Sequence, residues 1–162
     1  MATFGWSLIA RAKSGRLRKI GHPSKLVDSV YIDNAADAHL QAADRLAPSS
    51  PVAGKAYFIS QGEPIPLSEL MDRILAAAGL GPVTRTVSPR FAYAVGWLLE
   101  VAYRLAGRTA EPPMTRFLAR QLSTAHWFDL SAARRDLDYE PKVSIDEGLD
   151  RLKTWLEENA DC

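Results

Sequence analysis

Strand-like and helix-like segments alternate along the chain, with Gly, Pro and Ser at the boundaries between them. Residues 26–32, 55–60 and 125–130 are rich in β-branched and aromatic side chains and predict strands, and residues 83–87 are expected to be extended. Because strands and helices alternate, the sequence predicts an α/β or mixed α+β fold. Parallel strands need several neighbours and covered faces, so these few strands are expected to form the edge of a larger sheet.

Apolar residues at helical spacing, bounded by capping residues and glycines, predict the helices. They are expected at residues 5–14, 33–46, 67–78, 89–106, 114–122 and 131–137, and after residue 144. The expected N-caps are Asp33 or Asn34, Ser88 followed by Pro89, Ser131, and Ser144 in a capping box with Glu147.

The length of 162 residues suits one domain and is enough to bury about 70% of the unfolded surface. The composition, 47% hydrophobic and 24% charged, is that of a globular protein. Cys162 is the single cysteine, which excludes a disulfide framework and a multi-cysteine zinc site. No apolar run is as long as a membrane span.

The net charge of +1 conceals a basic N-terminal stretch. Residues 1–27 contain six Lys and Arg and no acid, whereas the remainder has 14 basic and 19 acidic residues. Three interpretations remain open: a mitochondrial presequence, a phosphate-binding segment, or a solvated helix and loop. We expect no nucleic-acid partner, because the rest of the chain would repel a phosphate backbone. Secretion is not expected, since the charges follow the first apolar stretch.

Several common catalytic and cofactor motifs are missing from the sequence. The GLGPV segment at 79–83 follows a predicted helix and lacks a third glycine, so it is not a dinucleotide fingerprint. The three histidines are far apart and form no metal-binding pair. No GxSxG motif is present. The sequence therefore predicts no catalytic residue and no metal site within this chain.

Polar residues follow the predicted strand 26–32. Ligands of open α/β sheets bind beyond the carboxyl ends of strands, where Asp33 and Asn34 are expected. Helix capping is the alternative role, and the two roles are compatible.

The segment FAYAVGWLLEVAYRLAG, residues 91–107, is almost entirely apolar. Glu100 and Arg104 make it a poor membrane span. Tyr93, Trp97 and Tyr103 leave three interpretations open: a packed core helix, the wall of an apolar ligand pocket, or a helix on a membrane or partner surface.

Three segments resemble the C-terminal half of extended short-chain dehydrogenases, above all the 3β-hydroxysteroid and sterol dehydrogenase branch. They are KLVDSVYIDNAADAH (25–39), GKAYFISQGEPIPLSEL (54–70) and HWFDLSAARRDLDYEPKVSIDEGL (126–149), in the family's order and with similar spacing. The resemblance departs at Asp138, where the family has Gly, and at Ala132, where it has Lys.

The resemblance implies a partial Rossmann-type sheet edge plus a small C-terminal substrate-binding domain. Residues 1–60 would be a remnant of the NAD(P)-binding domain, interleaved with a mostly helical substrate-binding domain at 61–162. Tyr31, Asp33 and Asn34 match the family's strand-end motif, near its substrate and nicotinamide. The family uses NAD or NADP and a catalytic Y-x-x-x-K pair, which no tyrosine of this chain supplies.

Three functional hypotheses follow. The chain is the substrate-side half of an oxidoreductase for an apolar alcohol or sterol-like substrate, binds no NAD(P) alone and needs a complementing N-terminal half. Alternatively, it is a non-catalytic module for an apolar ligand, a membrane surface or a partner protein. A decayed or misread gene without activity is the third. We expect self-association through an unpaired sheet edge, and a cytoplasmic or peripheral membrane location.

Overall fold

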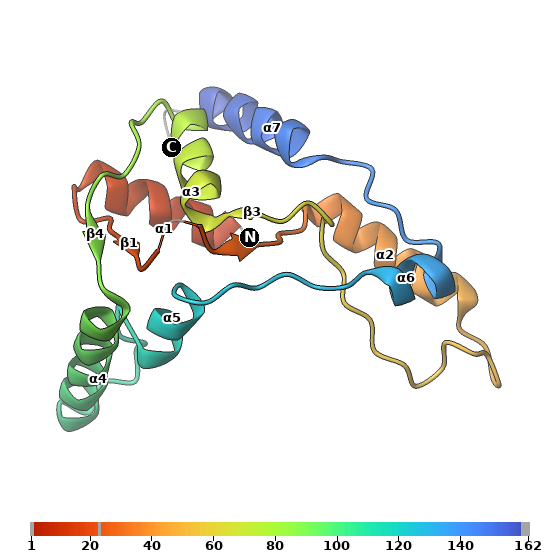
Figure 1. Ribbon diagram of the computed structural model, residues 1–162, viewed down its shortest axis with the longest axis horizontal. Coiled ribbons are helices and arrows are strands. Elements are labelled where there is room, and N and C mark those ends of the chain that lie inside the picture. The colour runs from red at the N-terminus through yellow and green to blue at the C-terminus, as the bar shows by residue number, and fades with distance from the viewer. Residues whose placement is uncertain (1, 23, 160–162) are drawn as a thin grey trace.

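The computed structural model describes residues 2–22 and 24–159 and has a mixed α/β fold (Figure 1). This confirms the fold class expected from the sequence. Cys162 lies outside the described residues. The helices are α1 (Ala2–Lys13), α2 (Ile32–Arg45), α3 (Leu67–Ala77), α4 (Pro89–Leu105), α5 (Arg116–Gln121), α6 (Ser131–Leu137) and α7 (Ile145–Glu158). The strands are β1 (Lys19–Ile20), β2 (Leu26–Val27), β3 (Ile65–Pro66) and β4 (Thr86–Val87).

The strands form two small sheets among the described residues. β1 pairs with β4 in parallel, and β2 pairs with β3 in antiparallel orientation. An isolated parallel bridge joins Val27 to His126, so residues 65–66 and 126 lie on opposite sides of β2. Each sheet links segments that are distant in sequence and fixes the helices between them.

The predicted strands are longer than the observed ones. Residues 55–60 form no strand, the segment 125–130 is reduced to the bridge at His126, and the first strand ends at Val27. Among the described residues, the backbone amides of 56–60 and 127–130 donate no hydrogen bond to the protein. These segments have strand-like sequences, but no strand of the described residues pairs with them.

The helix predictions are confirmed, with some corrections at the caps. Ser88 Oγ accepts from the Phe91 amide at 3.2 Å, and Ser144 Oγ accepts from the Glu147 amide at 3.2 Å. The Glu147 carboxylate accepts a hydrogen bond from the Arg151 guanidinium instead of from the Ser144 amide that a capping box requires.

Neither Asp33 nor Asn34 is the N-cap of α2, because the helix begins at Ile32 and both residues lie within its first turn. Ser131 is also not a cap. The N-cap position is Leu130, and the Asp129 carboxylate accepts from the Ser131 amide at 2.8 Å just before the helix.

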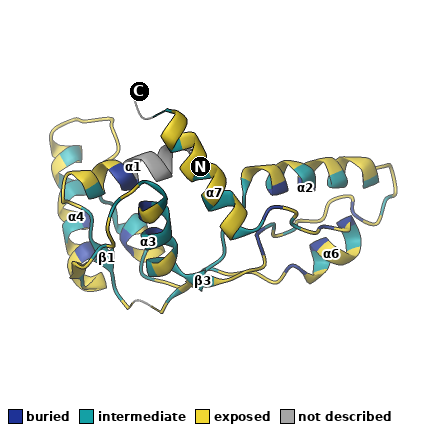
Figure 2. Ribbon diagram, turned by 90° about the horizontal axis from the view of Figure 1, so that it is seen from above, coloured by how far each residue is buried: buried dark blue, intermediate teal, exposed yellow. Residues whose placement is uncertain are grey.

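Two apolar cores lie at opposite ends of the molecule (Figure 2). The first joins α2 and α6 through Ala38, Ala133, Leu137 and the fully buried Tyr139. The second joins α1, α3 and the side of α7, and its buried members are Leu8, Ile9, Met71 and Leu75. Both cores combine residues from before and after position 60. The division into a unit at 1–60 and a unit at 61–162 stays a prediction.

Helices α4 and α5 form an arm that extends away from both cores (Figure 1). They pack closely because Gly96 has no side chain: a Cβ there would lie 2.6 Å from the Thr115 carbonyl carbon. The Glu100 carboxylate fastens the pair by accepting from the Arg116 backbone amide and from its guanidinium, both at 2.7 Å. The arm is therefore a defined helical pair joined to the body at its ends.

Candidate functional site

Asn34, one of the three strand-end residues, is a buried structural residue. Its amide group donates to Gln61 Oε1 at 2.9 Å and to the Val143 carbonyl at 2.8 Å. Its side-chain oxygen accepts from the backbone amides of Lys142 and Val143 at 2.9 and 3.0 Å. Every hydrogen-bonding position of the side chain is used. The predicted site residue therefore joins the start of α2 to two distant segments and has no free group for a ligand.

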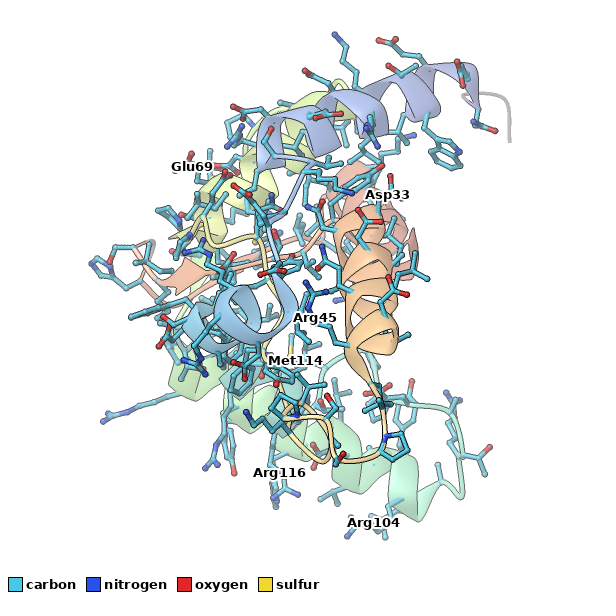
Figure 3. The ribbon with its side chains drawn as sticks, turned by 90° about the vertical axis from the view of Figure 1, so that its right-hand side faces the viewer. Asp33, Arg45, Glu69, Arg104, Met114 and Arg116 are labelled. Carbon is cyan, nitrogen blue, oxygen red and sulfur yellow. The ribbon has the colours of Figure 1, made fainter. Side chains whose placement is uncertain are left out.

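Tyr31 and Asp33 are brought together by α7. Arg151 donates to the Asp33 carboxylate at 2.9 Å, and its guanidinium carbon lies 5.3 Å from the centroid of the Tyr31 ring. The Tyr31 ring fills the space beside Gly148, where a Cβ would be 2.9 Å from the ring. Figure 3 shows Asp33 at the end of α2 that lies nearest to α7. The two residues thus form a partly exposed cluster that anchors α7 to α2.

Asp28 organises a second cluster that sequence analysis missed. Its carboxylate accepts from the Gly62 amide at 3.0 Å and from the Ser60 hydroxyl at 2.8 Å. The Tyr139 hydroxyl donates to the Ser60 carbonyl at 2.9 Å, and burial, together with the Asp28 charge, raises the pKa of that phenol. A useful signal was an acidic residue inside an otherwise apolar predicted strand. This cluster holds the loop after residues 55–60 against the segment that follows β2.

A small hollow of about 70 Å³ lies between β1, α3, β4 and the end of α5. We call it the Lys25 hollow. Its apolar lining includes Ile20, Leu67, Met71 and Leu122, and its basic lining is Lys19, His22 and Lys25.

The basic residues of the Lys25 hollow differ in their partners. Lys19 Nζ is bonded to Asp72 at 2.6 Å. Lys25 forms no ion pair with any described residue, and its ammonium group lies over Gly21, in the space that a side chain there would fill. Gly21 also adopts a φ of +75°, which favours glycine. The hollow therefore combines apolar walls with an uncompensated cation, an arrangement suited to a carboxylate on an apolar body.

A larger open hollow of about 680 Å³ lies beside the Lys25 hollow along α3. Its charged lining residues are Glu69, Asp72 and Arg73. These are already paired: Asp72 with Lys19, and Arg73 with Asp146 and Glu69. Ser68 lines both hollows, so they are contiguous.

Tyr93, Trp97 and Tyr103, the aromatic candidates of the long helix, line neither hollow. Arg120 stacks on the Tyr93 ring and Arg108 on the Tyr103 ring, each at 5.3 Å. Trp97 is about half exposed, at 51%. The interpretation of these residues as a pocket wall stays a prediction.

Glu100 remains charged within the arm. The Arg116 backbone amide, and then the Arg116 guanidinium, lower the pKa of the Glu100 carboxyl against the opposing effect of burial. Among the described residues, no group of three or more His, Cys, Asp and Glu side chains could hold a metal ion.

Comparison with known proteins identifies the family. The profile of the 3-beta hydroxysteroid dehydrogenase/isomerase family matches residues 4–90. The chain belongs to this family. The resemblance inferred from the three sequence segments is thereby confirmed, and the family is one of oxidoreductases with a Rossmann-type fold.

The most similar curated relatives include two 2-alkyl-3-oxoalkanoate reductases. The protein from Shewanella oneidensis is 51% identical over 150 residues, which are 92% of this chain and 39% of the relative. The protein from Stenotrophomonas maltophilia is 52% identical over 146 residues, 90% of this chain and 44% of the relative. The decarboxylating sterol-4-alpha-carboxylate 3-dehydrogenase of Schizosaccharomyces pombe is 33% identical over 157 residues. This dehydrogenase/isomerase family chain thus spans about two fifths of the length of these two reductases.

Solved structures share the fold at low sequence identity. The crystal structure of gox2253 aligns over 96% of this chain and 43% of its own, with a TM-score of 0.61 and 22% identity. The UDP-glucuronic acid 4-epimerase of Bacillus cereus, solved in complex with NAD, aligns over 93% of this chain and 38% of its own, with a TM-score of 0.58 and 16% identity.

The described residues of this family member do not form a dinucleotide cradle. A pyrophosphate is held by a glycine-rich turn between a strand and a helix. Gly79 and Gly81 instead follow the end of α3 and lead into an irregular segment before β4. Gly79 and Gly81 therefore do not form a turn of that kind.

Proposed function

We propose that this chain is the substrate-side part of an NAD(P)-dependent oxidoreductase that acts on an apolar acid with an oxygen on the carbon beta to the carboxylate. The dinucleotide and the proton-transferring residues would be held by a separate or preceding part. Neither site is recognisable among these 162 residues, which contain no glycine-rich fingerprint and no Y-x-x-x-K pair.

The names of the relatives support this substrate class. A 2-alkyl-3-oxoalkanoate carries its oxygen at C3, beta to the C1 carboxylate. A sterol 4-carboxylate that is dehydrogenated at C3 has the same relation between oxygen and carboxylate. Identity is higher with the two reductases than with the sterol enzyme, which favours a branched fatty acid over a sterol for this chain.

The observation that carries the proposal is the Lys25 hollow. A β-oxo acid offers one carboxylate and a large hydrocarbon body. In the hollow the free ammonium of Lys25 would bind the carboxylate, while Ile20, Leu67 and Met71 would contact hydrocarbon. The open hollow along α3 leaves room beyond it for an alkyl chain.

The unpaired segments support the need for a complementing part. Phe58 and Phe128 stack on each other with centroids 4.4 Å apart, and Trp127 lies beside Phe128 in sequence. All three are exposed, and they lie on the segments whose amides bond to no described residue. We call these three residues the sheet-edge surface. A strand from a dinucleotide-binding part would cover it and pair with its backbone.

Calorimetric titration of the chain with 2-butyl-3-hydroxyoctanoate and with its methyl ester tests the substrate class. We expect the acid to bind and the ester to bind at least tenfold more weakly. Lys25→Met should remove this preference for the acid. Lys153→Met, on the exposed face of α7, is the matched control and should keep it.

Equal binding of acid and ester, or an unchanged preference in Lys25→Met, would contradict the assignment. A parallel titration with NADH and NADPH should show no binding to the chain alone. Tight binding of either nucleotide would overturn the proposed division of the enzyme into two parts.

A further inference from the structure

Helix α4 has an apolar stripe on the side that faces away from α5. Phe91, Leu98 and Leu105 are seven residues apart and therefore lie within about 40° of one another on the helix, since each heptad drifts by about 20°. Their exposed fractions are 60%, 60% and 83%. Ala94 and Ala102 are exposed in the same sector. We call these five residues the α4 outer face.

The opposite side of α4 is already occupied. Ala92 and Gly96 are buried there, and Gly96 touches the backbone of Thr115 at the start of α5. The helix thus has two apolar sides, of which only one is covered by this chain. An exposed stripe that crosses four turns of one helix is more than the scattered surface leucines of a soluble protein.

The charges around the α4 outer face are mainly positive. Residues 84–122 contain six arginines and two glutamates and no other charged residue, against a net charge of +1 for the whole chain. Arg90 and Arg104 form no ion pair with a described residue, while Glu100 is committed to Arg116. Figure 3 shows Arg104 pointing outward at the end of the arm. The arm therefore presents hydrocarbon bordered by cations.

The hydrogen bonding of the α4 backbone decides which kinds of partner can cover the α4 outer face. A helix satisfies its own amides and carbonyls, so its cover needs no hydrogen bonds and can be hydrocarbon. A second copy of the arm would bring arginines against arginines, which repel. Anionic lipid headgroups would instead pair with Arg90, Arg104 and Arg108, while Phe91, Leu98 and Leu105 enter the acyl boundary.

We propose that the α4 outer face docks this protein onto the surface of an anionic lipid bilayer, with α4 parallel to the membrane plane. No helix of the described residues is long and apolar enough to cross a membrane. The proposal rests on α4 and its arginines and is independent of the substrate class proposed above.

Co-sedimentation with vesicles of phosphatidylcholine and phosphatidylglycerol tests this docking. We expect the full chain to bind vesicles that contain 40% phosphatidylglycerol and to bind pure phosphatidylcholine at least tenfold more weakly. The triple variant Phe91→Ser, Leu98→Ser, Leu105→Ser should lose at least tenfold in binding. Substituting Arg90 and Arg104 with Gln should lose about fivefold for each charge removed.

A matched control carries Ile32→Ser, Leu40→Ser and Leu46→Ser, which removes three similarly exposed apolar side chains at α2 and its C-terminal end. It should bind vesicles like the original chain. Circular dichroism should show that each variant remains folded. Equal binding to neutral and anionic vesicles, no binding at all, or a dimer in light scattering that the α4 triple variant abolishes would overturn the proposal.

Discussion

Two surfaces of the molecule expose aromatic and aliphatic side chains, and their backbones differ. The sheet-edge surface lies on extended segments whose amides at 56–60 and 127–130 bond to no described residue. The α4 outer face lies on a helix whose amides bond within the helix. Judged only by their exposed apolar side chains, the two surfaces would be expected to bind the same kind of partner. The backbone shows that the first needs a partner able to form hydrogen bonds, whereas the second can be covered by hydrocarbon.

The surroundings of the two surfaces reinforce this difference. The segment before Phe58 is tied to α6 by Asp136, which accepts from Lys55 and from Tyr57 at 3.1 and 3.0 Å. The α4 outer face is bordered by Arg90 and Arg104, which form no ion pair with a described residue. We therefore expect protein to cover the first surface and anionic lipid to cover the second.

The largest expected effect is a loss of folding stability that loosens the sheet-edge region before it loosens α4. Asn34→Ala removes four hydrogen bonds and leaves the Val143 amide and carbonyl buried without that partner. We expect the free energy of unfolding to fall by about 3 kcal/mol in urea titrations. Proteolysis should then attack residues 55–62 before α4, because Gln61 loses its support from α2.

Asp33→Ala is the control for Asn34→Ala, since the neighbouring Asp33 forms only an exposed ion pair with Arg151. It should leave stability nearly unchanged. Similar losses in the two variants would show that the buried network does not hold the sheet-edge region.

The second largest effect is expected in the packing of α4 against α5 and is confined to the arm. Gly96→Ala places a methyl group against the backbone of Thr115 and Arg116, which cannot move aside as a side chain could. We expect α4 and α5 to separate, at a cost of about 2 kcal/mol, with faster hydrogen exchange in α5. Gly81→Ala, with open space around the new methyl group, should have little effect. Unchanged exchange in α5 of Gly96→Ala would contradict the close packing of the arm.

A smaller effect is expected at the start of α4. Ser88→Ala removes the acceptor for the Phe91 amide and should cost about 1 kcal/mol of helix stability. Hydrogen exchange of the first turn of α4 should accelerate. The sheet-edge segments should exchange as before. Acceleration in both regions would indicate that the two surfaces are not independent.

The smallest expected effect is a dependence of folding stability on pH through Asp136. Hydrogen bonds from Arg135, Lys55 and Tyr57 lower the pKa of Asp136 to about 2 from its ordinary 3.8. A depressed carboxyl pKa stabilises the fold above the ordinary value, and this contribution is lost as the pH falls through about 2. The stability difference between the original chain and Asp136→Asn should therefore shrink between pH 4 and pH 2.

The control for this pH dependence is Asp150→Asn, at an exposed carboxylate on α7 that forms no ion pair with a described residue. Its stability difference from the original chain should stay constant over that range. A constant difference for Asp136→Asn would show that Asp136 does not fasten residues 55–57.

Local sequence signals predicted most of the helices, because caps and apolar spacing act within a few residues. Two caps, at Ser88 and Ser144, could be predicted because their partners lie three residues away in sequence. The contact of Gly96 with Thr115 could not be predicted, because it depends on tertiary packing. The strand at 55–60 was mispredicted because its sequence favours a strand, whereas no strand of the described residues pairs with it.

The candidate site was harder to predict than the helices. Asn34 was recognised by its motif, but its burial against Val143 depends on a segment 109 residues away. Lys25 carried no local signal, because what distinguishes it is that no described acidic residue pairs with it, and this depends on the tertiary fold. Asp33 and Tyr31 are neighbours in the motif, yet Arg151 joins them only through the docking of α7.

Two tryptophans allow the most direct test of the central claim that the two surfaces have different occupants. Trp97 lies on α4 and Trp127 on the sheet-edge surface, with similar exposed fractions of 51% and 57%. Two variants would each keep one of them, with the other tryptophans changed to Phe. Brominated anionic vesicles should quench Trp97 and leave Trp127 unchanged. The part of the Shewanella oneidensis relative that this chain does not align with should shift the emission of Trp127 to the blue and leave Trp97 unchanged. Quenching of Trp127 by lipid, or a shift of Trp97 with the protein partner, would contradict the account.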